Sequence, residues 1–224
     1  GISRVTVVGD TRFDRVLQIR EEAKHLPLVE LFKNNTMTFV AGSSWQPDED
    51  LFIEYFNQHP EVKLVIAPHV IDENHLVEII RKLKRPYVRY TRADEKNVRK
   101  ADCLIIDCFG LLSSIYRYGE IAYIGGGFGV GIHNTLEAAV YGIPVIFGPK
   151  YQKFQEAIQL LETKGAFSVK DYEELKTLLD RMLTDEVFLR ESGMNASNYV
   201  TSNAGATDKI MSCLLYTSDA ADER

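Results

Sequence analysis

Residues 121–137 read IAYIGGGFGVGIHNTLE and contain the change of pattern that decides the fold class. Ile121–Ile124 is a short apolar run of β-branched and aromatic side chains, which is typical of a buried strand. A glycine-rich turn follows, and a helix is expected to begin at Asn134. Glycines let an anionic ligand approach the backbone, and the N–H groups of a helix amino terminus attract phosphate. The stretch therefore predicts a strand, a turn and a helix arranged around a phosphate or carboxylate.

The alternation of strand and helix extends to both sides of this stretch. From Met37 onward, apolar β-rich segments alternate with segments of helical period, which is typical of a parallel sheet covered by helices on both faces. The predicted strands are Met37–Ala41, Val62–Ala67, Tyr87–Tyr90, Cys103–Ile106, Ile121–Ile124 and Pro144–Phe147. One helix is predicted to begin at Pro47, and the others are Asp72–Lys84, Leu111–Tyr118, Asn134–Tyr141, Phe154–Lys164, Tyr172–Leu183 and Glu186–Thr201. We therefore expect an α/β fold with a Rossmann-like parallel sheet.

The two ends of the chain differ from this pattern. Residues 1–36 hold an apolar run, Val5–Val8, that is expected to form a strand, and then a helix; we interpret them as an interdomain connector that leads into a sheet domain of residues 37–215. Because the sequence opens at Gly1 without Met, we expect further sequence upstream. Residues 216–224 change abruptly to small and acidic side chains, and we interpret them as a tail that need not be native.

Composition limits the classes of function. The 224 residues are 45% hydrophobic, which is enough for one substantial core. The formal net charge of −6 argues against general binding to nucleic acid, which requires a basic surface. Cys103, Cys108 and Cys213 form neither a CxxC pair nor a zinc-like cluster, so we expect reduced thiols. No signal peptide opens the sequence and no apolar run approaches the roughly 20 residues of a membrane-spanning helix, so we expect this domain to be soluble by itself.

Polar or glycine-rich segments directly follow four of the predicted strands, at residues 42–45, 68–69, 107–110 and 125–129. Ligands of an open parallel sheet bind beyond the carboxyl ends of its strands, where such loops converge. Several loops at one edge indicate a binding site more strongly than one loop does. The spacing of the glycines does not match the nicotinamide fingerprint, and no Gly-Lys-Ser/Thr of a Walker loop follows.

Two interpretations are open for Asn134 and Glu137. An Asn helix cap with an acid three residues later is close to a capping box, which stabilises a helix without any ligand. Alternatively, Glu137 accepts hydrogen bonds from ribose hydroxyls, and the two roles can coexist. His133 is favoured as a functional residue because it lies among glycines ahead of a helix, not on an apolar face.

Other polar residues near the predicted site have structural explanations. Ser43 and Ser44 are first expected to cap the helix at Pro47, and His69 could simply end a strand. The acids at residues 48–50 look like a metal-binding DxD pair, but their place in a helix first turn is explained by the helix dipole. We therefore assign no metal.

Outside the predicted site, two histidines and a basic run also have simple explanations. His59 and His75 lie among polar residues and are expected to be solvated. The basic run at residues 81–85 is explained as the last turn of a helix that complements the helix dipole. Contact with a membrane surface is the less favoured alternative for this run.

Seven motifs occur in an order that is specific when they are taken together. They lie at residues 9–14, 42–45, 67–69, 110–119, 125–128, 133–139 and 144–149. From about Val5 to Leu214, the chain resembles the carboxy-terminal domain of the 3-deoxy-D-manno-octulosonic acid (Kdo) transferases. The most specific part is His-Asn-x-x-Glu-Ala-Ala followed by Pro-Val-x-x-Gly-Pro.

The resemblance implies a GT-B glycosyltransferase, in which two Rossmann-like domains face each other across a cleft. Residues 37–215 would bind the nucleotide-sugar donor CMP-Kdo, and an amino-terminal domain would bind the lipid A precursor. The implied contacts are Gly110 and Leu111 with the base, Glu137 with the ribose, Ser43, Ser44, Gly126, Gly127 and Asn134 with the phosphate and sugar carboxylate, and His69 near the sugar. Family members often have Arg where Pro68 stands here, which leaves the contact of this loop with the sugar carboxylate open.

The implied reaction is displacement of CMP from the anomeric carbon of Kdo by an acceptor hydroxyl. It needs a general base and stabilisation of the leaving phosphate. The helix start at Asn134 could stabilise the leaving phosphate. The resemblance implies that the general base lies in the amino-terminal domain, so the catalytic residues stay unknown. We expect this chain to bind the donor, to use no cofactor and to transfer little or no sugar. The resemblance further implies lipopolysaccharide biosynthesis and peripheral contact with the cytosolic face of the bacterial inner membrane.

Two other interpretations stay open. Other GT-B proteins, such as UDP-sugar transferases and UDP-sugar 2-epimerases, share the glycine turn and a ribose-binding glutamate, and nucleotide preference would separate them from a Kdo transferase. The chain could also be a nucleotide-binding module without catalysis. Fold alone does not decide between these functions, because many functions share this scaffold.

Overall fold

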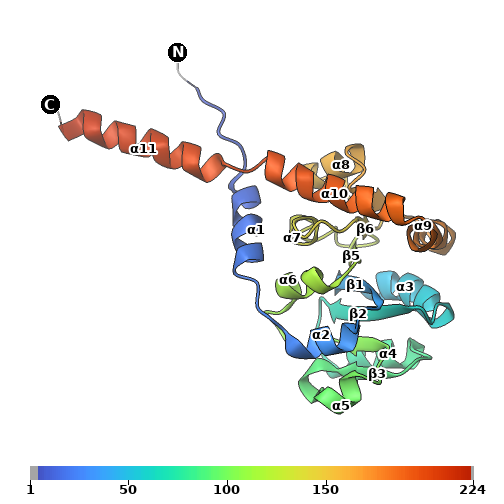
Figure 1. Ribbon diagram of the computed structural model, residues 1–224. Coiled ribbons are helices and arrows are strands. Elements are labelled where there is room, and N and C mark those ends of the chain that lie inside the picture. The colour runs from blue at the N-terminus through green and yellow to red at the C-terminus, as the bar shows by residue number, and fades with distance from the viewer. Residues whose placement is uncertain (1–4, 223–224) are drawn as a thin grey trace.

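A parallel sheet of seven strands forms the centre of the molecule, in the order β3-β4-β2-β1-β5-β6-β7 (Figure 1). The computed structural model describes the backbone of residues 5–222 and the side chains of residues 5–214. The strands are β1 Met37–Ser44, β2 Val62–Pro68, β3 Tyr87–Arg89, β4 Cys103–Ile105, β5 Ile121–Ile124, β6 Val145–Phe147 and β7 Ala166–Ser168. Every neighbouring pair is parallel, which confirms the predicted α/β class.

All six strands predicted from Met37 onward are present, and the sequence missed β7. This strand reads Ala-Phe-Ser, and the lack of a β-branched side chain leaves it without the pattern that marks the equally short β3, β4 and β6. It pairs with β6 at the edge of the sheet.

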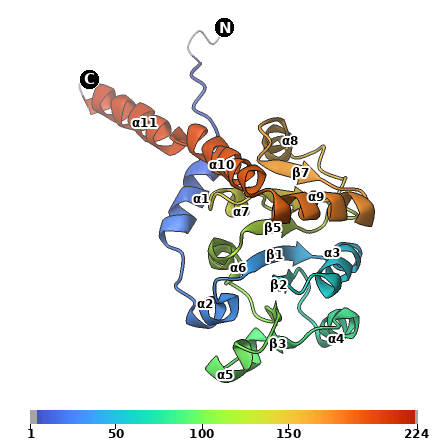
Figure 2. The same ribbon diagram turned by 45° about the vertical axis from the view of Figure 1, so that its right-hand side comes forward.

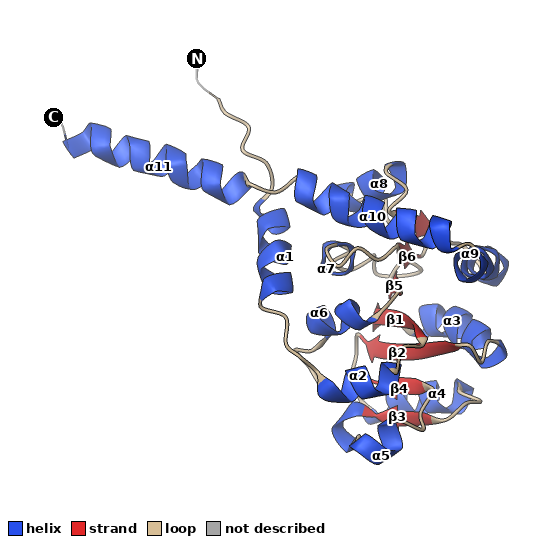
Figure 3. Ribbon diagram, in the orientation of Figure 1, coloured by secondary structure: helices blue, strands red, loops and turns tan. Residues whose placement is uncertain are grey.

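The helices lie on both faces of the sheet (Figures 2 and 3). They are α1 Thr11–Glu21, α2 Pro27–Lys33, α3 Gln46–Gln58, α4 Glu73–Lys82, α5 Glu95–Val98, α6 Leu112–Ile115, α7 Leu136–Ala139, α8 Gln155–Glu162, α9 Tyr172–Thr184, α10 Glu186–Ser202 and α11 Ala206–Asp222. Short 3₁₀ turns lie at Tyr90–Arg92 and Tyr116–Tyr118. The helices predicted at 111–118 and 134–141 are thus shortened to α6 and α7.

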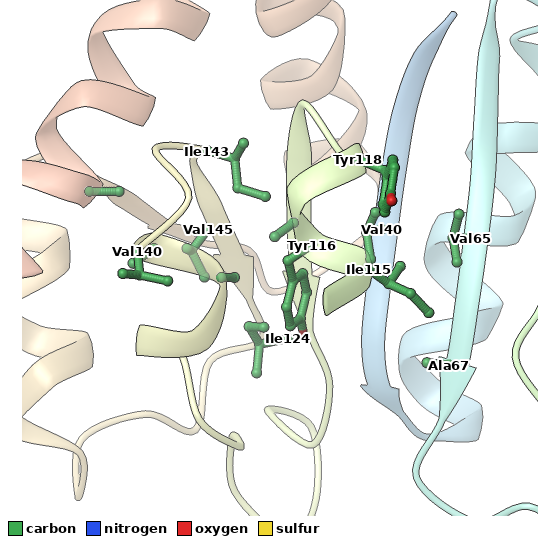
Figure 4. Packing of buried hydrophobic residues seen from close by; sticks show 14 of the residues in the cluster. Val40, Val65, Ala67, Ile115, Tyr116, Tyr118, Ile124, Val140, Ile143 and Val145 are labelled. Carbon is green, nitrogen blue, oxygen red and sulfur yellow. The ribbon is translucent and has the colours of Figure 1, made fainter. Parts of the chain in front are cut away.

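Two hydrophobic clusters fill the space between the sheet and the helices. Alternate strand residues face opposite sides, so that Phe39 belongs to the cluster under α3, α4 and α9, whereas Val40 faces α1, α2, α6, α7, α8 and α10. Figure 4 shows part of the second cluster, where Val40 and Val65 lie near Ile115 and the ring of Tyr116 lies beside Ile124. The inner strands β4, β2, β5 and β6 are buried on both faces, as is typical of parallel sheets.

The amino-terminal segment differs from the prediction. Residues 5–8 form no strand, and Val5 and Val7 are exposed, so the strand predicted there is wrong for the described chain. The helix α1 begins at Thr11, where the side chain of Asp10 accepts a hydrogen bond from the backbone of Arg12. Helices α1 and α2 bury apolar side chains in the second cluster. The role of residues 1–36 as an interdomain connector stays a prediction.

The carboxy-terminal helix α11 extends away from the sheet (Figure 1). Its amino terminus is held by Asp14 of α1, which accepts hydrogen bonds from the backbone of Gly205 and from both the backbone and the hydroxyl of Thr207. The change of composition at residue 216 falls inside this helix, so it is not a boundary of secondary structure. The interpretation of residues 216–224 as a tail that need not be native stays a prediction.

Candidate functional site

The chain leaves the central strand β1 through a bulge at the predicted site. Strand β1 pairs with β2 on one side and with β5 on the other, so its carboxyl end lies at the point where the strand order reverses. Ser43 has a positive φ of 51°, and the register with β2 shifts between Gly42 and Ser44. A Cβ on Gly42 would lie 1.9 Å from the Tyr116 hydroxyl oxygen, so this position requires glycine. The bulge brings Ser43 to the edge of the sheet.

An open cavity of about 240 Å³ lies beside this bulge. Its lining comes from the carboxyl ends of β1 and β2, the segments after β2 and β4 and the start of α6, and it consists of Ser43, Ala67, Pro68, His69, Ile71, Ile106, Cys108, Phe109, Gly110 and Leu112. The structure therefore brings three of the predicted site residues together, namely Ser43, His69 and Gly110. Leu111 is half-buried beside them at the start of α6.

The loop that carries Gly110 is anchored by Asp107 at the end of β4. The buried carboxylate of Asp107 accepts hydrogen bonds from Arg89 Nε at 2.8 Å and from the backbone and hydroxyl of Thr91 at 2.9 and 2.6 Å. Burial raises the pKa of Asp107, but these hydrogen bonds outweigh it and hold the pKa below its usual value. The carboxylate therefore stays ionised and fixes the start of the loop.

Three aromatic side chains meet where the loops after β1, β2 and β5 converge. Trp45 stacks on His69 with ring centroids 4.7 Å apart, and His69 stacks on His133 at 4.3 Å. Trp45 Nε1 lies 3.3 Å from His133 Nε2. Burial, and then the nearby His69, lower the pKa of His133. The predicted residues His69 and His133 thus share one cluster, which the sequence analysis did not foresee because it gave Trp45 no role of its own.

The glycine turn after β5 is compact and tied to its neighbours. Gly126 has a φ of 94°, and its carbonyl accepts hydrogen bonds from the N–H groups of Gly129 and Gly131. A Cβ on Gly127 would lie 2.5 Å from the backbone nitrogen of Gly148, so the two segments approach too closely for a side chain. The N–H of Gly126 donates to Asp48 at 2.9 Å, so a ligand would have to bind to other groups of the turn.

Asn134 and Glu137 lie at the start of the short helix α7. Asn134 Nδ2 donates to Glu137 Oε1 at 3.0 Å, and Asn134 Oδ1 accepts from the backbone of Leu136 at 3.2 Å. The predicted capping function is therefore partly present, although the helix begins two residues later than predicted. Burial raises the pKa of Glu137, and the hydrogen bond from Asn134 opposes this shift. Glu137 also contributes to the raised pKa of the buried Tyr116, after burial itself, which puts it near the ring that packs on Gly42.

Two acids in the first turn of α3 are buried, whereas the sequence analysis explained them by the helix dipole alone. Asp48 Oδ2 accepts from the backbone of Trp45 at 3.0 Å and from Gly126, and Asp48 Oδ1 accepts from the Tyr123 hydroxyl at 2.9 Å. Burial raises the pKa of Asp48, and its three hydrogen bonds oppose the shift. Asp48 therefore joins α3 to β5 and to the glycine turn.

Glu49 connects the other loops of the site. Glu49 Oε1 accepts from the Ser44 hydroxyl at 2.9 Å, and Glu49 Oε2 lies 2.9 Å from His75 Nε2. His75 Nδ1 in turn lies 2.9 Å from the carbonyl oxygen of Val70. The pair Glu49–His75 thus fixes the loop that follows His69. The only signal in the sequence was that both acids follow Ser44 within five residues, but inward orientation cannot be read from spacing alone.

Three expectations from the sequence are corrected here. Neither serine caps α3: Trp45 stands at the N-cap, and the hydroxyl of the fully buried Ser44 donates to Glu49. His75 is not solvated, because it pairs with Glu49, and His59 stacks on the ring of Tyr55 at 3.7 Å with only 18% of its side chain exposed.

The basic run at residues 81–85 agrees with the prediction in part, because Arg81 and Lys82 lie in the last turn of α4. Arg85 lies beyond the end of α4, and its guanidinium donates to the carbonyl oxygens of Phe56, His59 and Val62 near the end of α3. Lys82 pairs with Asp50 at 2.7 Å. The run therefore complements the dipole of α3, a neighbouring helix, as well as its own.

Within the described part of the chain, His, Cys, Asp and Glu side chains nowhere gather in threes as metal ligands do. Among the same residues, none of the helices combines the length and the apolar character needed to cross a membrane.

The fold is that of known nucleotide-sugar-binding domains. The structure of the C-terminal CMP-Kdo binding domain of WaaA from Acinetobacter baumannii superposes with a TM-score of 0.67 at 17% identity, covering 84% of this chain and 97% of that one. HepE of Anabaena in complex with UDP-glucose gives a TM-score of 0.59 at 14% identity, covering 90% of this chain and 55% of that one. The chain therefore has the Rossmann-like fold of the C-terminal domains of GT-B glycosyltransferases.

Several of the curated relatives that the chain matches by sequence are Kdo transferases. The chain is 32% identical over 190 residues to the 3-deoxy-D-manno-octulosonic acid transferase of Aquifex aeolicus, which covers 82% of this chain and 49% of that protein. The chain is thus a relative of the Kdo transferases, and it spans about half the length of the curated relatives it matches. No family model matches the chain.

Proposed function

We propose that this chain is the donor-binding domain of a glycosyltransferase that moves Kdo from CMP-Kdo to a lipid A precursor in lipopolysaccharide biosynthesis. The observation that carries the proposal is the sequence similarity to Kdo transferases over most of the chain. The cavity at the switch point supports it, because this is where open α/β sheets bind nucleotides.

The proposed contacts are those that the resemblance to Kdo transferases implies, limited to the groups that the protein itself leaves available. The loop at Gly110 and Leu111 would meet the base, and the carboxylate of Glu137 would accept hydrogen bonds from the ribose. Ser43, Gly127 and Asn134 would meet the phosphate and the sugar carboxylate, with His69 and His133 beside the sugar. The Ser44 hydroxyl already donates to Glu49, and the Gly126 N–H already donates to Asp48. We therefore propose that these two residues hold the site in shape and do not bind the ligand.

The transfer step needs more than this site. A general base must take the proton of the acceptor hydroxyl as the bond from Kdo to CMP breaks. The resemblance puts that base in the amino-terminal domain of the family, so we propose that residues 1–224 bind the donor without transferring the sugar. The acceptor lipid and the contact with the cytosolic face of the inner membrane would then involve the rest of the protein. Transfer of Kdo by this polypeptide alone would contradict this part of the proposal.

Calorimetric titration of the chain with CMP and then UDP tests the donor site. We expect saturable CMP binding that weakens by about tenfold in Glu137→Ala, since loss of a charge-assisted hydrogen bond has an effect of this size. Glu173→Ala, an exposed acid in the first turn of α9, is the matched control and should bind CMP normally. A clear preference for UDP would instead favour a GT-B protein that uses a UDP-sugar, and no binding of either nucleotide would contradict the proposed function.

A further inference from the structure

The aromatic cluster of Trp45, His69 and His133 joins the two sides of the switch point. Trp45 follows β1 and His69 follows β2, whereas His133 follows the glycine turn after β5. The rings stack in the order Trp45, His69, His133, and the indole nitrogen of Trp45 reaches back to His133 Nε2 at 3.3 Å. The stacking and the hydrogen bond both fix the plane of the His133 ring.

The chemistry of this hydrogen bond determines where His133 carries its proton. An indole N–H can only donate, so His133 Nε2 must accept with a free lone pair. A neutral imidazole whose Nε2 is unprotonated carries its proton at Nδ1. A doubly protonated ring would present an N–H group to the N–H of Trp45 and would face His69 at 4.3 Å.

The orientation of the ring agrees with this assignment. A Cβ built on Gly126 would lie 3.4 Å from His133 Cδ2, so the edge formed by Cδ2 and Nε2 is turned toward the protein. The opposite edge, with Nδ1 and Cε1, is therefore turned away from Trp45 and Gly126. His133 is half-buried, which leaves part of its ring accessible.

We propose that Trp45 is a positioning residue that holds His133 as the neutral tautomer protonated at Nδ1, so that His133 offers the bound donor an N–H group and not a cation. The ligand in this statement rests on the proposed function, whereas the tautomer is a property of the free chain. The acceptor on the ligand would be an oxygen of the phosphate or of the sugar carboxylate, because both are anionic acceptors.

Imidazole ¹⁵N spectra of the 224-residue chain test the tautomer directly. His133→Asn identifies the resonances of His133 among those of the five histidines by their disappearance. At pH 7.5 without ligand, we expect a protonated Nδ1 and an unprotonated Nε2. Protonation at Nε2 in the unmodified chain would overturn the proposal, and the variant serves only to assign the resonances.

Trp45→Phe separates the hydrogen bond from the stacking, because it keeps an aromatic ring but has no N–H. We expect the His133 tautomer to shift toward Nε2–H and the affinity for CMP-Kdo to fall about 3- to 10-fold, as for loss of one neutral hydrogen bond. An unchanged His133 tautomer in this variant would overturn the role of Trp45.

A double-mutant cycle with His133→Asn gives the matched control. The Asn amide can replace the Nδ1–H donor but has no ring nitrogen that needs Trp45 to set its protonation. In the His133→Asn background we therefore expect Trp45→Phe to change the affinity less than twofold; a full additional loss would contradict the coupling. If the unmodified chain binds no nucleotide, the proposed function fails, while the ¹⁵N spectra still decide the tautomer.

Discussion

The first turns of α3 and α7 carry similar polar residues but use them differently. In α3, Asp48 and Glu49 are fully buried, and every side-chain oxygen has a protein partner. In α7, Glu137 is half-buried, and among the described residues its side chain forms a hydrogen bond only with Asn134. An acid that the protein satisfies completely holds the site together, whereas an acid with free acceptor capacity can bind a ligand.

This difference predicts opposite responses to mutation. Removal of a carboxylate from α3 leaves buried donors without partners, which lowers stability. Removal of the charge from α7 removes the free-energy cost of burying the Glu137 carboxylate. It should therefore lower ligand affinity without lowering stability.

The largest effect is expected for Asp48→Ala. The variant leaves the N–H groups of Trp45 and Gly126 and the hydroxyl of Tyr123 without their acceptor, so we expect the free energy of unfolding to fall by about 3 kcal/mol. Urea denaturation measures this change. The control is Glu54→Ala, an exposed acid of the same helix, which should change stability by less than about 0.5 kcal/mol. Equal losses in the two variants would contradict the role of Asp48.

A smaller effect is expected from the pair Glu49–His75. Burial lowers the pKa of His75, but its hydrogen bonds to Glu49 and Val70 outweigh it and hold the pKa above the ordinary value of 6.5. The folded protein therefore binds this proton more tightly than the unfolded chain. The resulting stabilisation should be fully present below pH 6.5 and be lost as the pH rises through the folded pKa.

Denaturation of His75→Gln at a series of pH values tests this dependence. We expect a loss of about 1 to 2 kcal/mol at pH 6 that becomes smaller at higher pH, as for a hydrogen bond to a charged group. His25→Gln is the control, because the exposed His25 also pairs with an acid, Glu30, but in solvent. A loss that does not change with pH would mean that the proton on His75 is not involved.

The smallest effect on stability is expected for Glu137→Gln. Because burial raises the pKa of Glu137, its ionised form is disfavoured by folding, and replacing it by a neutral amide should leave stability at pH 7 unchanged or slightly higher. CMP binding to the unmodified chain should weaken as the pH falls toward this raised pKa, above the ordinary value of 4.5, since the ribose hydroxyls need an ionised acceptor. Destabilisation as large as that of Asp48→Ala would mean that Glu137 holds the site in shape and would contradict its role in binding.

Much of the site could be predicted because it depends on chain order. Loops that follow parallel strands must lie at one edge, so Ser43, His69 and Gly110 were expected together, and they line one cavity. The buried acids were not foreseen, because Asp48 and Glu49 follow Pro47 in a pattern that also suits an exposed first turn. Only the packing of α3 on the loops after β2 and β5 turns these side chains inward.

The sequence by itself determined the alternation of strands and helices, the glycine turn and the likeness to Kdo transferases, because apolar period, backbone freedom and motif order are properties of neighbouring residues. It did not determine that residues 5–8 form no strand. It also did not determine the hydrogen bonds from Arg85 to carbonyl oxygens near the end of α3 or from Trp45 to His133. Those contacts join segments 23 to 88 residues apart. Only tertiary structure decides them, because burial and the choice of hydrogen-bond partner depend on what packs against a side chain and not on what precedes it.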